Sequence, residues 1–296
     1  VRLSPLRDVD RSTVHLFLFA QVRRRLPQAW IDLAFLPPAA ERAFLAAAGL
    51  PLLVGTQSLR PAADFDLVLI SNAYLLELVN LPFLLLNSGI PLWASQRGPD
   101  WPPVVMGGSN ALACQAVLAP GGDALVDAVC FGEGEPVVGP LIEAVLAAPR
   151  ARRRAALAEL AGRVQGLWLA GTPGPVELAR CDPVNEPDLL AEAPVLNTAE
   201  ARAGALQISY GCPAFCSFCF EGYERKPYRE VPLAPLLEAA RRAKRARGLE
   251  EVNLHSFCAN AHGELFALLA QLQPRFDRIG LKSQRIDLLA GTPDLL

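Results

Sequence analysis

The chain has 296 residues, of which 52% are hydrophobic and 20% are charged, and its formal net charge is −2. This composition excludes a disordered chain, and the length allows two domains that each bury a core. The small net charge gives no electrostatic argument for a nucleic-acid partner or for binding to a membrane surface.

The sequence shows no pattern of export or membrane insertion. The first residues lack the basic, apolar and small-residue order of a signal peptide. The most apolar stretch, residues 73–94, is interrupted by Glu77, Asn80 and Pro82, which makes it a poor membrane span. Seven cysteines, three of them within eight residues, do not match a disulfide framework. We therefore expect a cytoplasmic protein without a membrane partner.

Strand-like and helix-like segments alternate through the first half of the chain. Residues 65–71 form a continuous apolar run, which is typical of a strand buried in a parallel sheet. Gly49 is placed to end one helix and Pro136 to begin another. The alternation predicts an α/β fold with a Rossmann-like open parallel sheet domain over residues 1–148. The expected strands are 30–36, 65–71, 104–106 and 128–131, and the expected helices are 39–48, 74–86 and 137–148.

The periodicity weakens between residues 149 and 204, where turn-forming residues are frequent. This stretch is predicted to be a linker region with one helix and some strand pairing. It contains a run of arginines, for which we prefer a solvated helix face over a phosphate-binding role. The run consists of Arg150, Arg152, Arg153 and Arg154.

A second unit is predicted for residues 205–296. Its first helix ends before Gly248, and the basic residues in its last turns suit the helix dipole, so they need no nucleic acid to explain them. Three strands joined by two helices predict half of a (β/α) barrel. The expected strands are 206–209, 252–254 and 279–282, and the expected helices are 233–247 and 263–272.

Three cysteines directly follow the first of these strands, with the spacing C-x3-C-x2-C. They are Cys212, Cys216 and Cys219. Thiolates are soft ligands suited to iron–sulfur clusters. Three thiolates hold three irons of a cubane and leave the fourth iron open. That iron can bind the amino and carboxylate groups of S-adenosylmethionine, whose one-electron reduction gives a 5′-deoxyadenosyl radical.

A zinc site is the alternative interpretation of these cysteines. Zinc usually takes four ligands in paired sets. No second pair follows the cysteine loop, and the other donors nearby in the sequence are His255, Cys258 and His262. The cysteine spacing therefore favours a cluster over zinc.

The motif resembles the radical S-adenosylmethionine superfamily, in which the residue before the last cysteine is typically aromatic, as Phe218 is here. The strings FDLVLIS, VVMGG and DAVCFGEGE resemble the B12-binding-like Rossmann domain that precedes many of these enzymes. LHSFCANAHGELFALL and LKSQRIDLL resemble the second and third barrel strands of an uncharacterised subfamily. The resemblance covers nearly the whole chain and implies that residues 205–296 form the N-terminal half of a radical S-adenosylmethionine core.

The resemblance also implies residues that bind the cosubstrate. Ser256 and Asn260 would hold its methionine end, Arg285 would reach its carboxylate, and Phe218 would lie beside it; a structural role is the alternative for the first three. Glycines at the ends of the first domain's strands would line a cofactor crevice, or they simply make tight turns. These glycines are Gly107, Gly108, Gly132 and Gly134.

The implied cofactors are a [4Fe–4S] cluster and S-adenosylmethionine, with cobalamin as a third candidate. The sequence contains no D-x-H-x-x-G string, which is used by cobalamin domains with a histidine ligand. The first domain therefore either binds cobalamin without that histidine or is a scaffold with a vacated pocket. The implied partners are a substrate of unknown identity and a one-electron donor such as flavodoxin or ferredoxin.

The predicted barrel strands are fewer than a complete barrel of this family contains, so we expect the chain to be a fragment. One alternative function is that of a truncated, non-catalytic iron–sulfur protein or scaffold. The other is a methylthiotransferase, whose N-terminal domain holds a second cluster on three cysteines. Cys114 comes too late and is too isolated for that cluster, and Cys130 and Cys181 are interpreted as structural. Cys258 is either structural or an auxiliary ligand or hydrogen-atom donor.

Overall fold

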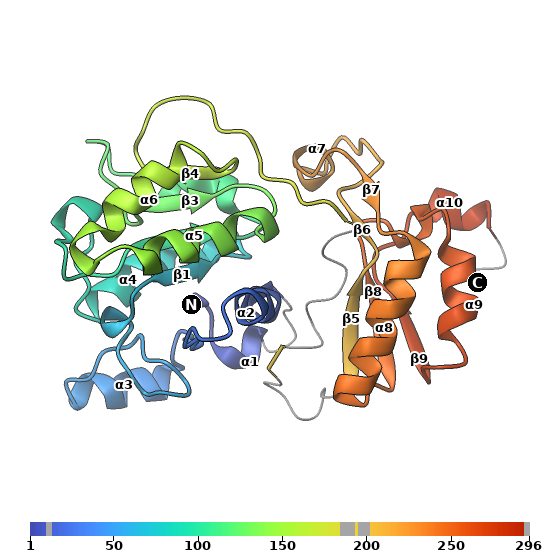
Figure 1. The fold of residues 1–296 in the computed structure, drawn as a ribbon, viewed down its shortest axis with the longest axis horizontal. Helices are drawn as coiled ribbons and strands as arrows, with labels where there is room; N and C mark the ends of the chain where they lie inside the picture. Colours follow the sequence, from blue (N-terminus) through green and yellow to red (C-terminus); the bar gives the residue numbers. More distant parts are fainter. Residues whose placement is uncertain (10–13, 184–192, 195–201, 293–296) are drawn as a thin grey trace. The chain divides into compact units, whose positions relative to one another are not determined.

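The computed structural model describes residues 1–9, 14–183, 193–194 and 202–292, and it divides into two compact units (Figure 1). The first unit is residues 1–180 and the second is residues 181–296. Each unit is built on its own mainly parallel sheet, which confirms the predicted α/β class. Among the described residues, no helix is long and apolar enough to cross a membrane.

The first unit contains a four-stranded sheet in the order β1-β2-β3-β4. The first three strands are parallel and the fourth is antiparallel to its neighbour. The four strands are β1 (Val68–Ser71), β2 (Val104–Gly107), β3 (Ala128–Cys130) and β4 (Leu167–Leu169).

Alternate side chains of these strands enter two different cores, because successive residues of a strand point to opposite faces. Val68 and Met106 pack with α4 on one face, whereas Val105 and Ala128 pack with α5 and α6 on the other. Burial on both faces explains why the strands are continuously apolar in the sequence. The helices are α1 (Leu6–Val9), α2 (Val14–Arg25), α3 (Ala39–Ala47), α4 (Asn80–Leu86), α5 (Glu135–Ala147) and α6 (Arg153–Ala161).

The expected helix at 74–86 is divided into a 3-10 helix and α4. Pro82 lies in the first turn of α4, where its missing N–H interrupts no helical hydrogen bond. The 3-10 helices of this unit are η1 (Ala62–Asp64), η2 (Leu75–Val79), η3 (Ala94–Gln96), η4 (Ala111–Val117) and η5 (Arg150–Arg152).

Residues 1–4 lie between residues 34–36 and β1. Arg2 forms parallel bridges to Phe35 on one side and to Ser71 on the other. The expected strand 30–36 is therefore wrong in extent, since it is reduced to a single bridge at Phe35 and is followed by two prolines that cannot donate. If residues 1–4 are counted as the first strand and residues 34–36 as the second, β1, β2 and β3 are the third, fourth and fifth. The order across the sheet is then 2-1-3-4-5, as in flavodoxin-like sheets. Ligands of such sheets bind at the carboxyl ends of the strands where the order reverses, here between residues 1–4 and β1.

The first unit continues beyond the boundary expected at residue 148. Part of the stretch expected as a linker, 149–204, folds onto this unit, because α6 packs against α5 and β4 adds an edge strand to β3. The arginine run is a solvated face only in part, since the Arg152 side chain is 70% exposed whereas those of Arg153 and Arg154 are largely covered. Arg153 pairs with Asp66 (2.7 Å), and Arg154 pairs with the buried carboxylate of Asp127 (2.8 Å).

The second unit contains a parallel sheet in the order β5-β8-β9, with α8 and α9 as the crossover helices. Leu206, Val252 and Leu254 point toward these helices and form the core. A two-stranded hairpin of β6 and β7 adjoins the sheet. The elements are β5 (Ala203–Gln207), β6 (Ser209–Tyr210), α7 (Glu221–Glu224), β7 (Arg229–Glu230), α8 (Leu233–Arg247), β8 (Glu251–His255), η8 (Ala259–Ala261), α9 (Leu265–Leu272), β9 (Arg278–Leu281) and α10 (Ile286–Ala290).

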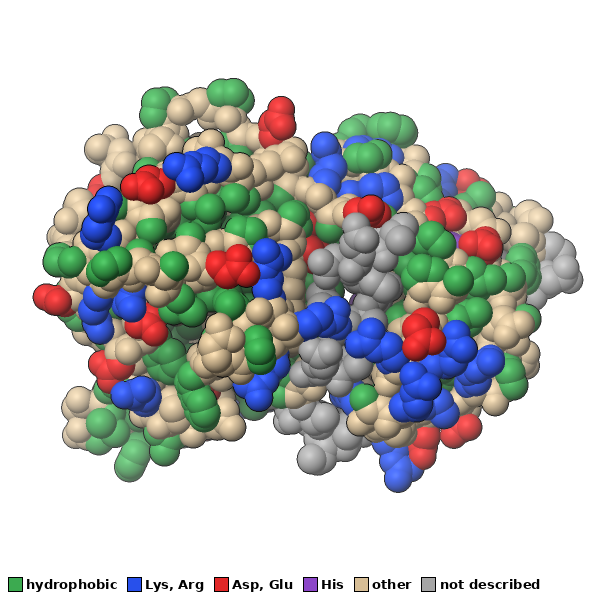
Figure 2. Space-filling model, viewed as in Figure 1, with side chains coloured by type: hydrophobic (Ala, Val, Ile, Leu, Met, Phe, Trp, Pro, Cys, Tyr) green, Lys and Arg blue, Asp and Glu red, His purple; other side chains and the backbone are tan. Residues whose placement is uncertain are grey.

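Helix α8 has the bounds predicted from the sequence. Its buried stripe, which includes Leu236 and Ala243, faces the sheet. Lys and Arg side chains gather over the α8 region of this unit (Figure 2). Lys244 donates to the carbonyl of Leu249 (2.9 Å) beyond the helix end, and Arg241 pairs with Glu238 (3.2 Å). These contacts agree with the prediction that the basic cluster serves the helix end.

Candidate functional site

The predicted cysteine loop leaves β6 and returns through α7 to β7, which pairs antiparallel with β6. The hairpin therefore closes the base of the loop. The loop begins at Gly211, whose φ is +71°. A Cβ there would lie 2.0 Å from the carbonyl oxygen of Arg225 and 2.7 Å from that of Pro227, so only glycine fits this turn.

Cys212, Cys216 and Cys219 are free thiols, each partly exposed. The backbone N–H of Cys219 donates to the carbonyl of Cys216 (3.0 Å), which forms a turn between the last two cysteines. Three soft donors on one short loop, none in a disulfide, can bind three irons of an iron–sulfur cluster. The residues present therefore fit the group.

Among the described residues, no three His, Cys, Asp or Glu side chains are placed to hold one metal ion together. A cubane makes a different demand, because each of its cysteines binds a different iron and the sulfurs lie farther apart than around a single ion. Both ring nitrogens of His262, one of the alternative zinc donors, already have partners within the protein. Its Nε2 contacts the carbonyl of Val231 (3.0 Å), and its Nδ1 accepts from the backbone N–H of Glu264 (3.1 Å).

Lys226 follows α7 and its side chain reaches back to hydrogen-bond the first part of the cysteine loop. The sequence analysis did not predict this role. Nζ of Lys226 donates to the carbonyls of Cys212 and Ala214, the latter at 3.0 Å. It also lies 3.9 Å from the centroid of the Phe215 ring, a cation–π contact. The one feature of the sequence that could have indicated this role is the position of Lys226, seven residues after Cys219 and shortly before β7.

Phe218 lies between the last two cysteines, and its side chain is 89% exposed. No described residue covers it, so its ring is accessible to a bound molecule. Its role beside the cosubstrate stays a prediction.

The loop after β8 carries Ser256, Cys258 and Asn260. The hydroxyl groups of Ser256 and Ser209 lie 2.6 Å apart, and the Ser256 oxygen also accepts from the backbone N–H of Cys258 (2.9 Å). Cys258 is fully buried, and burial, followed by the nearby charge of Cys212, raises the pKa of its thiol. Ser256 therefore joins the start of β6 to the end of β8 beside the cysteine loop, and its contact with a cosubstrate stays a prediction.

Asn260 and Arg285 join the loops that follow β8 and β9. The Asn260 amide donates to the carbonyl of Arg285 (2.9 Å) and accepts from its backbone N–H (3.0 Å). Nη1 of Arg285 donates to Sγ of Cys216 (3.6 Å). The structure thus brings the predicted residues of three separate loops to the carboxyl end of one parallel sheet, around the cysteines.

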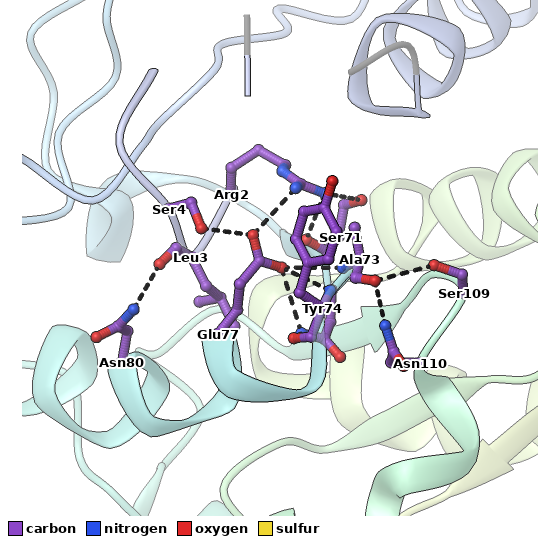
Figure 3. Close-up of polar contacts among 11 residues, drawn as sticks. Arg2, Leu3, Ser4, Ser71, Ala73, Tyr74, Glu77, Asn80, Ser109 and Asn110 are labelled. Atoms are coloured by element: carbon purple, nitrogen blue, oxygen red, sulfur yellow. Dashed lines mark hydrogen bonds and ion pairs between the residues drawn. The ribbon is translucent and has the colours of Figure 1, made fainter. Parts of the chain in front are cut away.

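In the first unit, a buried network fills the point where the strand order reverses (Figure 3). Arg2 and Glu77 form an ion pair (3.1 Å) with side chains that are 1% and 5% exposed. Glu77 also accepts from the hydroxyl of Ser4 (2.6 Å) and from the backbone N–H groups of Ala73 (3.0 Å) and Tyr74 (3.2 Å). The chain's own side chains therefore occupy the position that this topology gives to a ligand.

The four predicted crevice glycines lie against other parts of this unit. A Cβ on Gly108, whose φ is +116°, would lie 2.2 Å from the carbonyl oxygen of Asn72. One on Gly132 would lie 2.3 Å from that of Ala179, and Gly134 lies against Leu18 of α2. Gly107 lies against Cys130. These contacts support the tight-turn interpretation, and they also mean that bulky substitutions at Gly108 would damage the fold whether or not a cofactor binds.

A comparison with sequence families matched the family described as radical SAM proteins, N-terminal, to residues 16–169, just over half of the chain. The chain belongs to the radical SAM proteins. This finding confirms the predicted superfamily. The matched residues lie in the first unit, so the cysteine loop was identified independently, by its spacing and surroundings.

The solved structures that resemble this radical SAM chain include two of the radical S-adenosylmethionine methyltransferase TsrM from Kitasatospora setae. The one with tryptophan substrate and a SAM analog has a TM-score of 0.52 at 16% identity, covering 88% of this chain and 48% of that enzyme. The one with cobalamin and a [4Fe–4S] cluster has a TM-score of 0.49 at 15% identity, with the same coverage. The chain thus spans about half the length of the enzyme that it resembles. The search of curated proteins gave no match.

His15 of this radical SAM chain is buried in the first unit, edge-on to the ring of Phe35 (5.7 Å between centroids). Neither ring nitrogen has a hydrogen-bond partner among the described residues. Burial, followed by the charge of Arg2, lowers the pKa of His15 from 6.5 to about 4. The folded state therefore holds the imidazole neutral.

We expect the free energy of unfolding to fall by on the order of 2–3 kcal/mol as the pH is lowered from about 6.5 to about 4. In this interval the unfolded chain binds a proton at His15 that the folded chain does not bind, so acidification favours unfolding. Urea denaturation at about pH 7 and about pH 4.5 measures the difference. His15→Phe should remove this component, and an unchanged pH dependence in that variant would contradict the assignment.

Proposed function

We propose that this chain supplies the cluster-binding part of a radical SAM enzyme. The observation that carries the proposal is the position of three free thiols, Cys212, Cys216 and Cys219, on a loop at the carboxyl end of a parallel β/α sheet. Family membership of the first unit supports it independently. When bound, a [4Fe–4S] cluster supplies an electron that cleaves S-adenosylmethionine to a 5′-deoxyadenosyl radical.

The chain's own residues position and shield this chemistry. Gly211 and Lys226 fix the two sides of the cysteine loop. The loops after β8 and β9 lie beside it, so that Ser256 and Asn260 border the place where the methionine end of the cosubstrate would bind. Phe218 offers an exposed aromatic face to the rest of that molecule. Because geometry controls such reactions, small displacements of these loops would cost large factors in rate.

Anaerobic reconstitution tests the proposal. We expect about four irons per chain and, after reduction with dithionite, a cubane EPR signal that changes when S-adenosylmethionine is added. Formation of 5′-deoxyadenosine, followed by chromatography, reports cleavage. A reconstituted protein that binds iron but gives no cubane signal would contradict the proposal. A cubane without 5′-deoxyadenosine would favour the alternative of a non-catalytic iron–sulfur protein.

The same experiment distinguishes the methylthiotransferase alternative, which requires a second cluster in the N-terminal domain. The sequence of residues 1–180 contains only two cysteines, Cys114 and Cys130, so a three-cysteine site cannot form there. About four irons rather than about eight are therefore expected. The substrate, the flavodoxin-like or ferredoxin-like electron donor and the cytoplasmic location remain parts of the proposal, and the likeness to TsrM extends to the fold alone.

Cobalamin stays a separate prediction for the first unit. The buried pair of Arg2 and Glu77 fills the place where the strand order reverses, so a corrinoid there would require residues 1–4 to move. We therefore assign cobalamin no role in the reaction. Retention of stoichiometric hydroxocobalamin through gel filtration would support binding, and its spectrum would have to lack histidine ligation. Complete removal would support the scaffold interpretation.

A further inference from the structure

The guanidinium of Arg285 is held on one edge by a carboxylate. Its Nε donates to Oδ1 of Asp287 (3.0 Å) and its Nη2 donates to Oδ2 (2.6 Å), which is the paired geometry of a bidentate ion pair. Asp287 lies only two residues further along the chain, in α10. The Nε–Nη2 edge of the guanidinium is therefore already occupied by a carboxylate.

The main chain of Arg285 is held as well. The Asn260 side chain makes two hydrogen bonds to it, at 2.9 and 3.0 Å, from the loop after β8. A side-chain amide that satisfies both backbone groups of one residue fixes the position of that residue closely. Both ends of Arg285 are thus anchored by protein, before any cosubstrate is considered.

The remaining edge of the guanidinium points to the cysteine loop. Nη1 lies 3.6 Å from Sγ of Cys216, within hydrogen-bond distance for sulfur. Because Asp287 and Asn260 fix the other groups, the direction of this N–H is set by protein contacts. The side chain is partly exposed, at 36%, which leaves the contact near the surface of the loop.

We propose that Arg285 raises the reduction potential of the cluster by donating a hydrogen bond to the sulfur of Cys216. This inference rests on the proposed function. Reduction adds negative charge to a cluster and its thiolates, and an N–H donor to a ligating sulfur stabilises that charge. Arg285 is therefore a positioning residue that acts through Cys216. Its contact with the cosubstrate carboxylate stays a separate prediction.

The test is a redox titration followed by EPR, carried out without S-adenosylmethionine. We expect Arg285→Met to assemble the cluster and to shift its midpoint potential to more negative values, lowering the equilibrium constant for reduction by roughly tenfold. Arg285→Lys keeps the charge but cannot both pair with Asp287 and donate to Cys216, so it should give a smaller shift in the same direction. Omitting the cosubstrate matters, since a residue that only binds it would leave this potential unchanged.

Arg278 provides the matched control. It lies on β9 in the same unit, is 74% exposed and pairs with Glu251 (3.0 Å), so Arg278→Met removes the same charge away from the cysteines. The potential of this variant should equal that of the wild type. Equal shifts in both Met variants, or none in either Arg285 variant, would overturn the inference while the proposed function stands. A wild-type protein without any cubane would overturn the proposed function itself.

Discussion

Replacement of Cys212, Cys216 and Cys219 with alanine is expected to lower the bound iron from about four atoms per chain to a trace after anaerobic reconstitution. The brown colour and the cubane EPR signal should disappear together, and 5′-deoxyadenosine formation should fall to background. Each thiolate binds a different iron, so the single alanine variants should also fail to retain an intact cubane. Iron analysis and EPR on the same samples check this result.

Other cysteines of the chain give matched controls. Cys130 lies on β3, where burial raises the pKa of its thiol to about 12, and Cys181 is buried at the start of the second unit. A thiol that is hard to deprotonate is a poor metal ligand. Cys130→Ala and Cys181→Ala should therefore retain iron at the wild-type level. A triple variant of the loop that still bound about four irons with the same EPR signal would end the assignment.

The sequence predicted the features that depend on local pattern. The helix 233–247 was predicted at its observed bounds, because its buried positions recur with helical period and Gly248 follows its end. The continuously apolar strands β1 to β3 were recognised because helices cover both faces of their sheet. The cysteine loop was recognised because its spacing is contained in eight residues.

Features that depend on contacts between distant residues were missed. The strand expected at 30–36 pairs only at Phe35, since its neighbour is the short segment at residues 1–4. Nothing local predicted that Asp66 and Asp127 would pair with Arg153 and Arg154, because these partners lie far from the two arginines in the sequence. Arg285 was predicted from a resemblance, but its contacts with Asp287 and Cys216 could not be, because they depend on how the loop after β9 folds against the cysteine loop.

The buried ion pair of the first unit leads to the second large prediction. We expect Glu77→Ala to destabilise that unit by about 3–5 kcal/mol, because it would leave the Arg2 guanidinium buried without its counter-charge. The same change removes the acceptor of the Ser4 hydroxyl and of two backbone N–H groups (Figure 3). For a unit of this size the melting temperature should fall by roughly 6–20 °C.

A surface ion pair of the same unit provides the control. Glu143 accepts from Arg25 at 2.7 Å, a shorter contact than that between Arg2 and Glu77, but both side chains are more than two-fifths exposed. Solvent screens such a pair, so Glu143→Ala should cost no more than about 1 kcal/mol. Calorimetry on Glu77→Ala and Glu143→Ala therefore tests the effect of burial on the free energy of unfolding. The exposed pair has the shorter distance, but its loss is expected to cost less stability.

Replacement of both partners separates the charge from the packing. The double variant Arg2→Met with Glu77→Met removes both charges of the buried pair. The donors that it leaves unsatisfied are those whose acceptor is the Glu77 carboxylate, such as the backbone N–H groups of Ala73 and Tyr74. We expect this double variant to be more stable than Glu77→Ala, because an apolar pair avoids the cost of an unpaired buried ion. If Glu77→Ala alone melted within about 2 °C of the wild type, the network would not hold residues 1–4 against β1. The place where the strand order reverses could then open to a ligand, which makes this stability measurement also a test of the scaffold interpretation.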